Sequence, residues 1–150
     1  MEKEIAPAFP TLIGRFHPPD SEAMSRDLRR LVLEREQKEP NDAHANVSRR
    51  GHYHTVHNHP GSCWSGVYYV DCGTESEASQ ARSGVLDLLD PRPFTEMVPV
   101  PGEPYGQKIC VKPKPGMMLV FPGFLYHFVH PFDGDGERIS IAFNARTDRR

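Results

Sequence analysis

The sequence predicts a mainly β protein that forms one domain, a sandwich or barrel of jelly-roll type. Short apolar runs rich in β-branched and aromatic residues fill most of the chain after about residue 46. The 15 prolines and 12 glycines fall between these runs, a pattern typical of short strands joined by frequent turns. One stretch near the N-terminus has the periodicity of an amphipathic helix, and a length of 150 residues fits a single domain.

The N-terminal part, residues 1–45, is interpreted as an extension followed by one helix, and residues 46–144 as the barrel core. A helix is predicted from Asp20 or Ser21 to about Lys38, because a capping side chain is followed by apolar residues at helical spacing. These apolar residues are Met24, Leu28, Leu31 and Val32. We expect the helix to pack outside the barrel. A dimer contact, and hence a homodimer, is the alternative use of its apolar stripe.

The barrel core is predicted as a series of short antiparallel strands, at residues 51–56, 64–72, 84–89, 108–112, 117–121, 126–130 and 137–144. Pro115-Gly116 suits the central positions of a type II turn. Asp133 to Gly136 predicts a hairpin between the last two strands. The segment 91–106 contains five prolines and is interpreted as a semi-rigid lid.

Composition excludes several classes of function. Lys and Arg number 18 against 20 Asp and Glu, and no basic stripe is present, so nucleic acid is not an expected partner. Cys63, Cys72 and Cys110 have no metal-binding spacing and are interpreted as free thiols of a reducing compartment. The N-terminus lacks an apolar signal core, and no apolar run approaches a membrane span. We therefore expect a cytoplasmic protein without a membrane partner.

The histidines are the strongest chemical signal. Four of the eight lie within eight positions, namely His52, His54, His57 and His59. A His-X-His pair on an extended segment points both rings to one face, and Pro60 restricts His59 to the extended region. His57 and His59 are therefore candidate metal ligands. His52 and His54 are expected to lie behind the ligands or to face solvent.

His127 lies among large apolar side chains, so its neutral imidazole needs a partner, either a metal or a backbone carbonyl. His130 is expected on the opposite side of the same strand, so only one of the two can be a ligand. Further on, Arg138 and Ser140 share one face of a late strand. A guanidinium beside a hydroxyl matches a carboxylate, while a solvated surface arginine is the alternative. Three histidines can hold iron on one face and leave other positions open.

Several motifs stand in the order found in a known family. They are His57-X-His59-Pro60-Gly61-Ser62, Ser65-Gly66-Val67-Tyr68-Tyr69-Val70, Asp90-Pro91-Arg92, Pro113-Lys114-Pro115-Gly116, Phe121-Pro122, His127 and Arg138-Ile139-Ser140-Ile141-Ala142-Phe143-Asn144. Over about residues 46–144 the chain resembles the 2-oxoglutarate- and iron(II)-dependent oxygenases of bacteria and phages. The wider superfamily includes the prolyl hydroxylases. The resemblance implies a double-stranded β-helix, a cupin-like jelly-roll barrel, with the N-terminal helix outside it.

The resemblance also implies roles for individual residues. His57 takes the place of the proximal iron ligand and His127 that of the distal one. Arg138 takes the place of the residue that anchors 2-oxoglutarate, and we expect Ser140 to assist it. Tyr69 matches a tyrosine that contacts the cosubstrate in prolyl hydroxylases.

The chain departs from the superfamily at the second ligand, where His59 stands in place of a carboxylate. In one interpretation His59 is the third ligand. In the other, the frame shifts to His59-Pro60-Gly61 and two protein ligands remain, as in related halogenases and aspartyl/asparaginyl hydroxylases. We favour three histidines, because both rings of the pair are available.

The resemblance predicts an enzyme, a dioxygenase that uses Fe(II), 2-oxoglutarate and O2 to hydroxylate a C–H bond of a small-molecule or peptide substrate. One alternative is a three-histidine dioxygenase of cupin type without an oxoacid cosubstrate. The other is a non-catalytic metal-binding barrel, favoured by a zinc ion in a closed shell. Arg138 discriminates against the cupin-type enzyme, which needs no anchor on the late strand.

Overall fold

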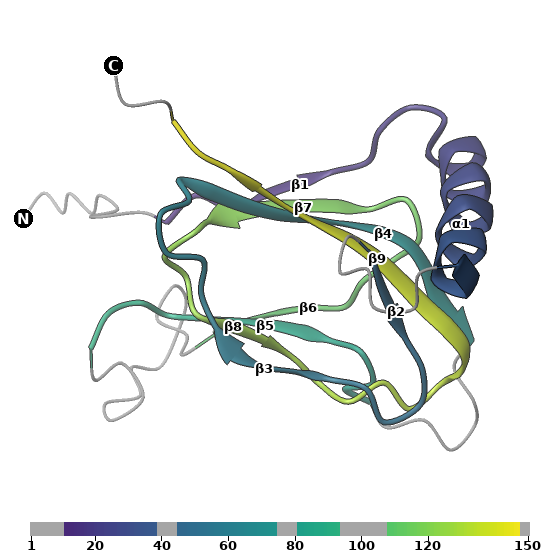
Figure 1. Cartoon of the computed structure of the whole chain (residues 1–150). Coiled ribbons are helices and arrows are strands. Elements are labelled where there is room, and N and C mark those ends of the chain that lie inside the picture. Colours follow the sequence, from purple (N-terminus) through teal and green to yellow (C-terminus); the bar gives the residue numbers. More distant parts are fainter. Residues whose placement is uncertain (1–10, 39–44, 75–80, 94–107, 148–150) are drawn as a thin grey trace, which may run out of the picture.

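The computed structural model describes residues 11–38, 45–74, 81–93 and 108–147. In these residues two antiparallel sheets face each other and a helix lies beside them (Figure 1). The large sheet has the order β1-β7-β4-β9-β2 and the small sheet the order β3-β8-β5-β6. The elements are β1 (Gly14–Phe16), α1 (Ser21–Lys38), β2 (Asn46–Ser48), β3 (His54–His57), β4 (Trp64–Thr74), β5 (Leu86–Leu89), β6 (Lys108–Val111), β7 (Met118–Pro122), β8 (His127–Val129) and β9 (Asp135–Ala145). The prediction of a mainly β fold with one N-terminal helix outside it is confirmed.

The helix α1 covers the outer face of the large sheet. Leu28, Val32 and Leu33 pack against a buried cluster formed by Tyr68, Val70 and Ile139. The predicted apolar stripe is wrong at its edge, because Met24 and Leu31 are exposed. The face of the helix that contacts the sheet is shifted toward Ser25 and Leu33. Ser25 forms a hydrogen bond with the hydroxyl of Tyr68 at 2.8 Å. Within the described residues no helix is long and apolar enough to cross a membrane.

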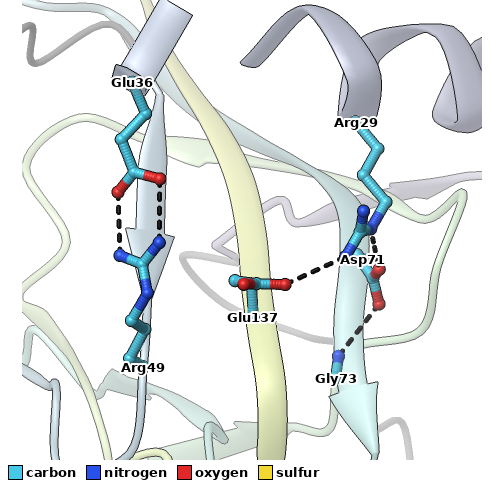
Figure 2. A network of polar contacts seen from close by, with 6 residues as sticks. All are labelled: Arg29, Glu36, Arg49, Asp71, Gly73 and Glu137. Atoms are coloured by element: carbon cyan, nitrogen blue, oxygen red, sulfur yellow. Dashed lines mark hydrogen bonds and ion pairs between the residues drawn. The ribbon is translucent and has the colours of Figure 1, made fainter. Parts of the chain in front are cut away.

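Ion pairs fasten α1 to the strands below it (Figure 2). Arg29 Nε donates to Asp71 Oδ2 at 2.8 Å, and its Nη2 donates to Glu137 Oε2 at 2.9 Å. Arg49 binds Glu36 through two parallel hydrogen bonds. All of these side chains are partly exposed, so each pair contributes at most about 1 kcal/mol and serves mainly to orient the helix.

The apolar core lies between the inner faces of the sheets. Its buried members are Tyr69, Leu86, Leu88, Val111, Met117, Leu119, Phe121 and Leu125. Beside this core, the inner face of β4 and β9 carries buried polar side chains, with Ser65, Arg138 and Ser140 exposed by 1%, 2% and 3%. A polar interior of this kind needs partners, and this places the candidate site inside the barrel.

Of three predictions about loops and turns, one is confirmed, one is wrong and one lies almost entirely outside the described residues. Gly116 has φ of 79°, as the predicted type II turn requires. The predicted hairpin at Asp133 to Gly136 is wrong, because β8 pairs with β3 and β5 whereas β9 pairs with β4 and β2. The chain crosses there from one sheet to the other, and Phe132 is buried at the crossing. The proposed lid at 91–106 lies almost entirely outside the described residues.

Candidate metal centre

Three histidines from two neighbouring strands converge at one end of the barrel. His57 ends β3, His127 begins β8, and the two are direct partners in the ladder, with ring centres 4.3 Å apart. The ring of His59, two residues further on, lies 5.2 Å from each of the other two rings. One nitrogen of each ring lies within 4.8 Å of the others. Among the described residues this is the single group of three or more side chains that can hold a metal ion.

Backbone carbonyls orient two of the rings. Thr55 O accepts a hydrogen bond from His57 Nδ1 at 2.7 Å, and Leu125 O accepts one from His127 Nδ1 at 2.9 Å. A carbonyl oxygen only accepts, so each Nδ1 carries the proton of the neutral ring. The lone pair of each Nε2 is therefore left for a metal.

Close packing of the backbone at Gly123 positions the segment that carries the third histidine, His59. The backbone N–H of His59 donates to Gly123 O at 2.9 Å, and Gly123 N–H donates to Cys63 O at 3.1 Å. A Cβ at Gly123 would lie 2.4 Å from the carbonyl oxygen of Ser62. Glycine at this position therefore allows the turn after β7 to lie directly against the segment that carries His59.

The environment favours uncharged imidazoles. Burial lowers the pKa of His127 to about 4. Burial, together with the nearby ring of His57, also lowers the pKa of His59. A neutral imidazole is the form that binds a metal, so these residues fit a divalent cation. His57 and His59 are partly exposed, which leaves one side of the cluster open.

A buried cation lies in the same interior. Arg138 is 2% exposed, its guanidinium lies 5.3 Å from the centre of the Tyr69 ring, and its Nε has no hydrogen-bond partner. No carboxylate of a described residue pairs with it, and burial lowers its pKa. Ser140 is the ladder partner of Tyr69, so both share a face with Arg138. A buried guanidinium without an anion is costly, and this interior therefore fits an anionic ligand.

Side chains near the histidines in the sequence face away from them. His130 lies on the outer side of the small sheet, as predicted, and its Nε2 is 3.0 Å from Asp87 Oδ2. Lys108 and Arg82 also bond this carboxylate. Burial would raise the pKa of Asp87, but hydrogen bonds from Lys108, Cys110 and His130, together with the charge of Lys108, hold it at about 2. Asp71 points outward to Arg29, so neither aspartate belongs to the histidine cluster.

His54 lies behind the ligands, one of the two positions that the sequence allows: it is half-buried, its ring lies 6.4 Å from that of His57, and it is not part of the ligand group. The sequence does not show how it comes to share a face with His57. The pairing of β3 with β8 shifts register between these two residues. Such a bulge has no clear signal in the local sequence, because strict alternation would place residues three apart on opposite faces.

The model of a family described as "Putative 2OG-Fe(II) oxygenase" matches residues 42–144. The chain belongs to this family. A search of curated proteins found no match. Among solved structures, the chain is similar to a Pseudomonas putida prolyl-4-hydroxylase, with 16% identity, 93% of this chain and 90% of that chain covered, and a TM-score of 0.63. This likeness confirms the predicted double-stranded β-helix.

Two further structures are similar to parts or most of the chain. One is an oxidoreductase of the 2OG-Fe(II) oxygenase family from Burkholderia pseudomallei, with 16% identity, coverage of 67% and 39%, and a TM-score of 0.46. The other is a viral collagen prolyl hydroxylase from Paramecium Bursaria Chlorella virus-1, with 14% identity, coverage of 91% and 80%, and a TM-score of 0.41.

Proposed function

We propose that the protein is an iron(II)- and 2-oxoglutarate-dependent dioxygenase that hydroxylates a C–H bond of a small molecule or peptide. The observation that carries this proposal is the buried Arg138, which has no carboxylate partner among the described residues and lies in the same interior as three convergent imidazoles. Bound iron and 2-oxoglutarate supply the activation of O2 and the oxidising power. The chain supplies the ligands, the anchor and a partly closed site.

In this proposal His57, His59 and His127 hold the iron. The family resemblance implies a carboxylate at the second ligand, but Asp71 and Asp87 both face out of the barrel, and among the described residues no carboxylate joins the histidine cluster. Three neutral ligands leave the full charge of the ion uncompensated by the protein. The dianionic cosubstrate provides that compensation when it binds.

Arg138 binds the distal carboxylate of 2-oxoglutarate, assisted by Tyr69 and Ser140. Burial raises the pKa of Tyr69 to about 12, so its hydroxyl remains a hydrogen-bond donor at neutral pH. In a cupin-type dioxygenase without an oxoacid, or in a metal-binding barrel, the buried guanidinium would have no anion. That cost favours the 2-oxoglutarate enzyme over both alternatives.

The test is an anaerobic titration of the protein with iron(II) and then with 2-oxoglutarate, following the visible metal-to-ligand charge-transfer band. We expect a band that saturates with one equivalent of cosubstrate. Replacing Arg138 by Ala should weaken 2-oxoglutarate binding by at least about 30-fold, which corresponds to about 2 kcal/mol. Arg30→Ala on the exposed face of α1 is the control. Iron binding without any response to 2-oxoglutarate would favour the cupin-type enzyme or the binding barrel.

The ligand set has its own test. The iron content of His57→Ala, His59→Ala and His127→Ala is measured after gel filtration, with His52→Ala as an exposed control on the same segment. We expect each of the first three variants to lose most of its iron. Full iron retention in His59→Ala would instead indicate the two-histidine site.

A further inference from the structure

A bulge in β3 turns a fourth histidine into the barrel. His54 pairs with Val129 and His57 pairs with His127, so three steps along β3 match two steps along β8. Directly paired residues share a face of the sheet, and Val129 packs against the interior core cluster. His54 therefore faces the interior together with His57, although a regular strand would place them on opposite sides.

Ladder pairing also fixes the depth of His54. The pair of His57 and His127 lies at the metal end, and the pair of His54 and Val129 lies two residues further along β8. At the next level, backbone hydrogen bonds join 51–52 to Phe132.

Phe132 and Arg138, the proposed anchor of the cosubstrate, both lie next to Gly84. A Cβ at Gly84 would lie within 3.6 Å of the Phe132 ring and 3.2 Å from the side chain of Arg138. Arg138 therefore lies at the same deep level as Phe132. After burial, the charges of Arg138 and His57 lower the pKa of His54, so its ring lies within reach of both the anchor and the metal ligands.

The ring of His54 has no hydrogen bond to another described residue, and it is not part of the group whose nitrogens converge on one point. A half-buried imidazole whose nitrogens have no hydrogen-bond partner in the described part of the chain is suited to a ligand. We propose that His54 donates a hydrogen bond to the oxo-acid end of 2-oxoglutarate, next to the metal, while Arg138 holds the distal carboxylate. This inference rests on the proposed cosubstrate.

The surroundings of His54 support this role. Burial, and then the positive charge of Arg138, lower its pKa, so the ring is neutral and carries one N–H donor and one acceptor. A neutral donor binds a carboxylate without adding a further cation beside the metal. Arg138 already satisfies the far carboxylate, which leaves the near one for His54.

The experiment compares His54→Ala with the exposed neighbour His52→Ala, both loaded with iron(II) without oxygen. We expect iron stoichiometry to be unchanged in both variants, because His54 is not a ligand. The dissociation constant of 2-oxoglutarate, from the charge-transfer band, should rise about 10-fold or more in His54→Ala, the effect of losing a hydrogen bond to a charged group. It should not change in His52→Ala. His54→Gln keeps an N–H donor and should recover part of the affinity.

A cosubstrate analogue without the distal carboxylate shows which end of 2-oxoglutarate His54 contacts. The probe is 2-oxopentanoate, which keeps the oxo-acid end and has a methyl group in place of the distal carboxylate. His54→Ala should weaken 2-oxopentanoate and 2-oxoglutarate by the same factor, whereas Arg138→Ala should weaken only 2-oxoglutarate. A loss confined to 2-oxoglutarate in His54→Ala would overturn the assignment, and so would a loss of iron.

Two failures are distinguishable. If the wild-type iron form does not respond to 2-oxoglutarate, the proposed function fails and this role fails with it. If the wild type binds 2-oxoglutarate and His54→Ala binds it equally well, the proposed function stands and the role of His54 is wrong.

Discussion

Arg138 and Asp87 are both buried charged side chains, but their surroundings are opposite. Asp87, on the outer side of the small sheet, is 0% exposed and bonded by Lys108, Arg82 and His130. Arg138, on the inner side of the large sheet, is 2% exposed and has no carboxylate partner among the described residues. Its guanidinium lies over the face of the Tyr69 ring, 5.3 Å from the ring centre.

The difference separates a structural charge from a functional one. Asp87 has charged partners in its own chain, all on Oδ2, and these join β5 to β6 and to the end of β8, although Oδ1 has no hydrogen-bond partner. No carboxylate among residues 11–38, 45–74, 81–93 and 108–147 offsets the desolvation of Arg138, and a ligand anion would do so. If this comparison is right, changes at the two residues should affect different properties of the protein.

The largest expected effect is on stability. Asp87→Ala leaves Lys108, Arg82 and His130, which are partly exposed, without their shared anion and should lower the free energy of unfolding by about 2–3 kcal/mol. Chemical denaturation of the metal-free protein measures this change. The affinity of the surviving folded protein for 2-oxoglutarate should stay within a factor of two or so, roughly the spread of additive distant sites. A specific loss of cosubstrate binding without a loss of stability would break the comparison.

The second effect is the pH dependence of that stability. The pKa of Asp87 is about 2 in the folded protein against an ordinary value of 3.8. A lowered folded pKa adds stability that is complete above about pH 4 and is lost as the pH falls from there through 2. The contribution is about 2 kcal/mol by linkage. Unfolding of wild type and Asp87→Asn is followed between pH 7 and 2, and the difference between them should shrink across that window. A constant difference would show that the carboxylate is not held ionised.

These contrasts also mark how far the sequence could predict the molecule. Strand alternation predicts that His57 and His59 point to one face, and the motifs of the family resemblance add His127 and Arg138. Alternation alone leaves open whether Arg138 faces inward, and its burial in the structure decides this. The bulge that turns His54 inward depends on pairing with β8, which is distant in the sequence. The crossing near Asp133 looked like a hairpin because its residues favour a tight turn in any context. Partner choice between sheets is a tertiary effect and leaves no local signal.

Gly84, in the loop before β5, lies against the side chain of Arg138. A substitution there should have a smaller effect on stability than Asp87→Ala. Gly84 has φ of 62°, and a Cβ there would lie 3.2 Å from Cδ and Nε of Arg138. Gly84→Ala should lower the free energy of unfolding by about 1–2 kcal/mol because of the left-handed backbone. It should also weaken 2-oxoglutarate severalfold by displacing the guanidinium. Gly51→Ala, with φ of 86° and open space around its Cβ, is the matched control. It should show the stability loss alone, and equal cosubstrate affinity in both variants would contradict the proposed contact.

The smallest effect has the opposite sign. Arg138→Met removes a buried charge that the described chain leaves unpaired and keeps most of the volume of the side chain. The free energy of unfolding of the ligand-free protein should therefore stay the same or rise by about 1 kcal/mol. Adding 2-oxoglutarate to the iron form should stabilise the wild type but not this variant, because binding to the folded state alone shifts the unfolding equilibrium. Thermal unfolding with and without ligand gives both measurements. A stability loss as large as that of Asp87→Ala would mean that Arg138 is bound within the fold and is not held ready for a ligand.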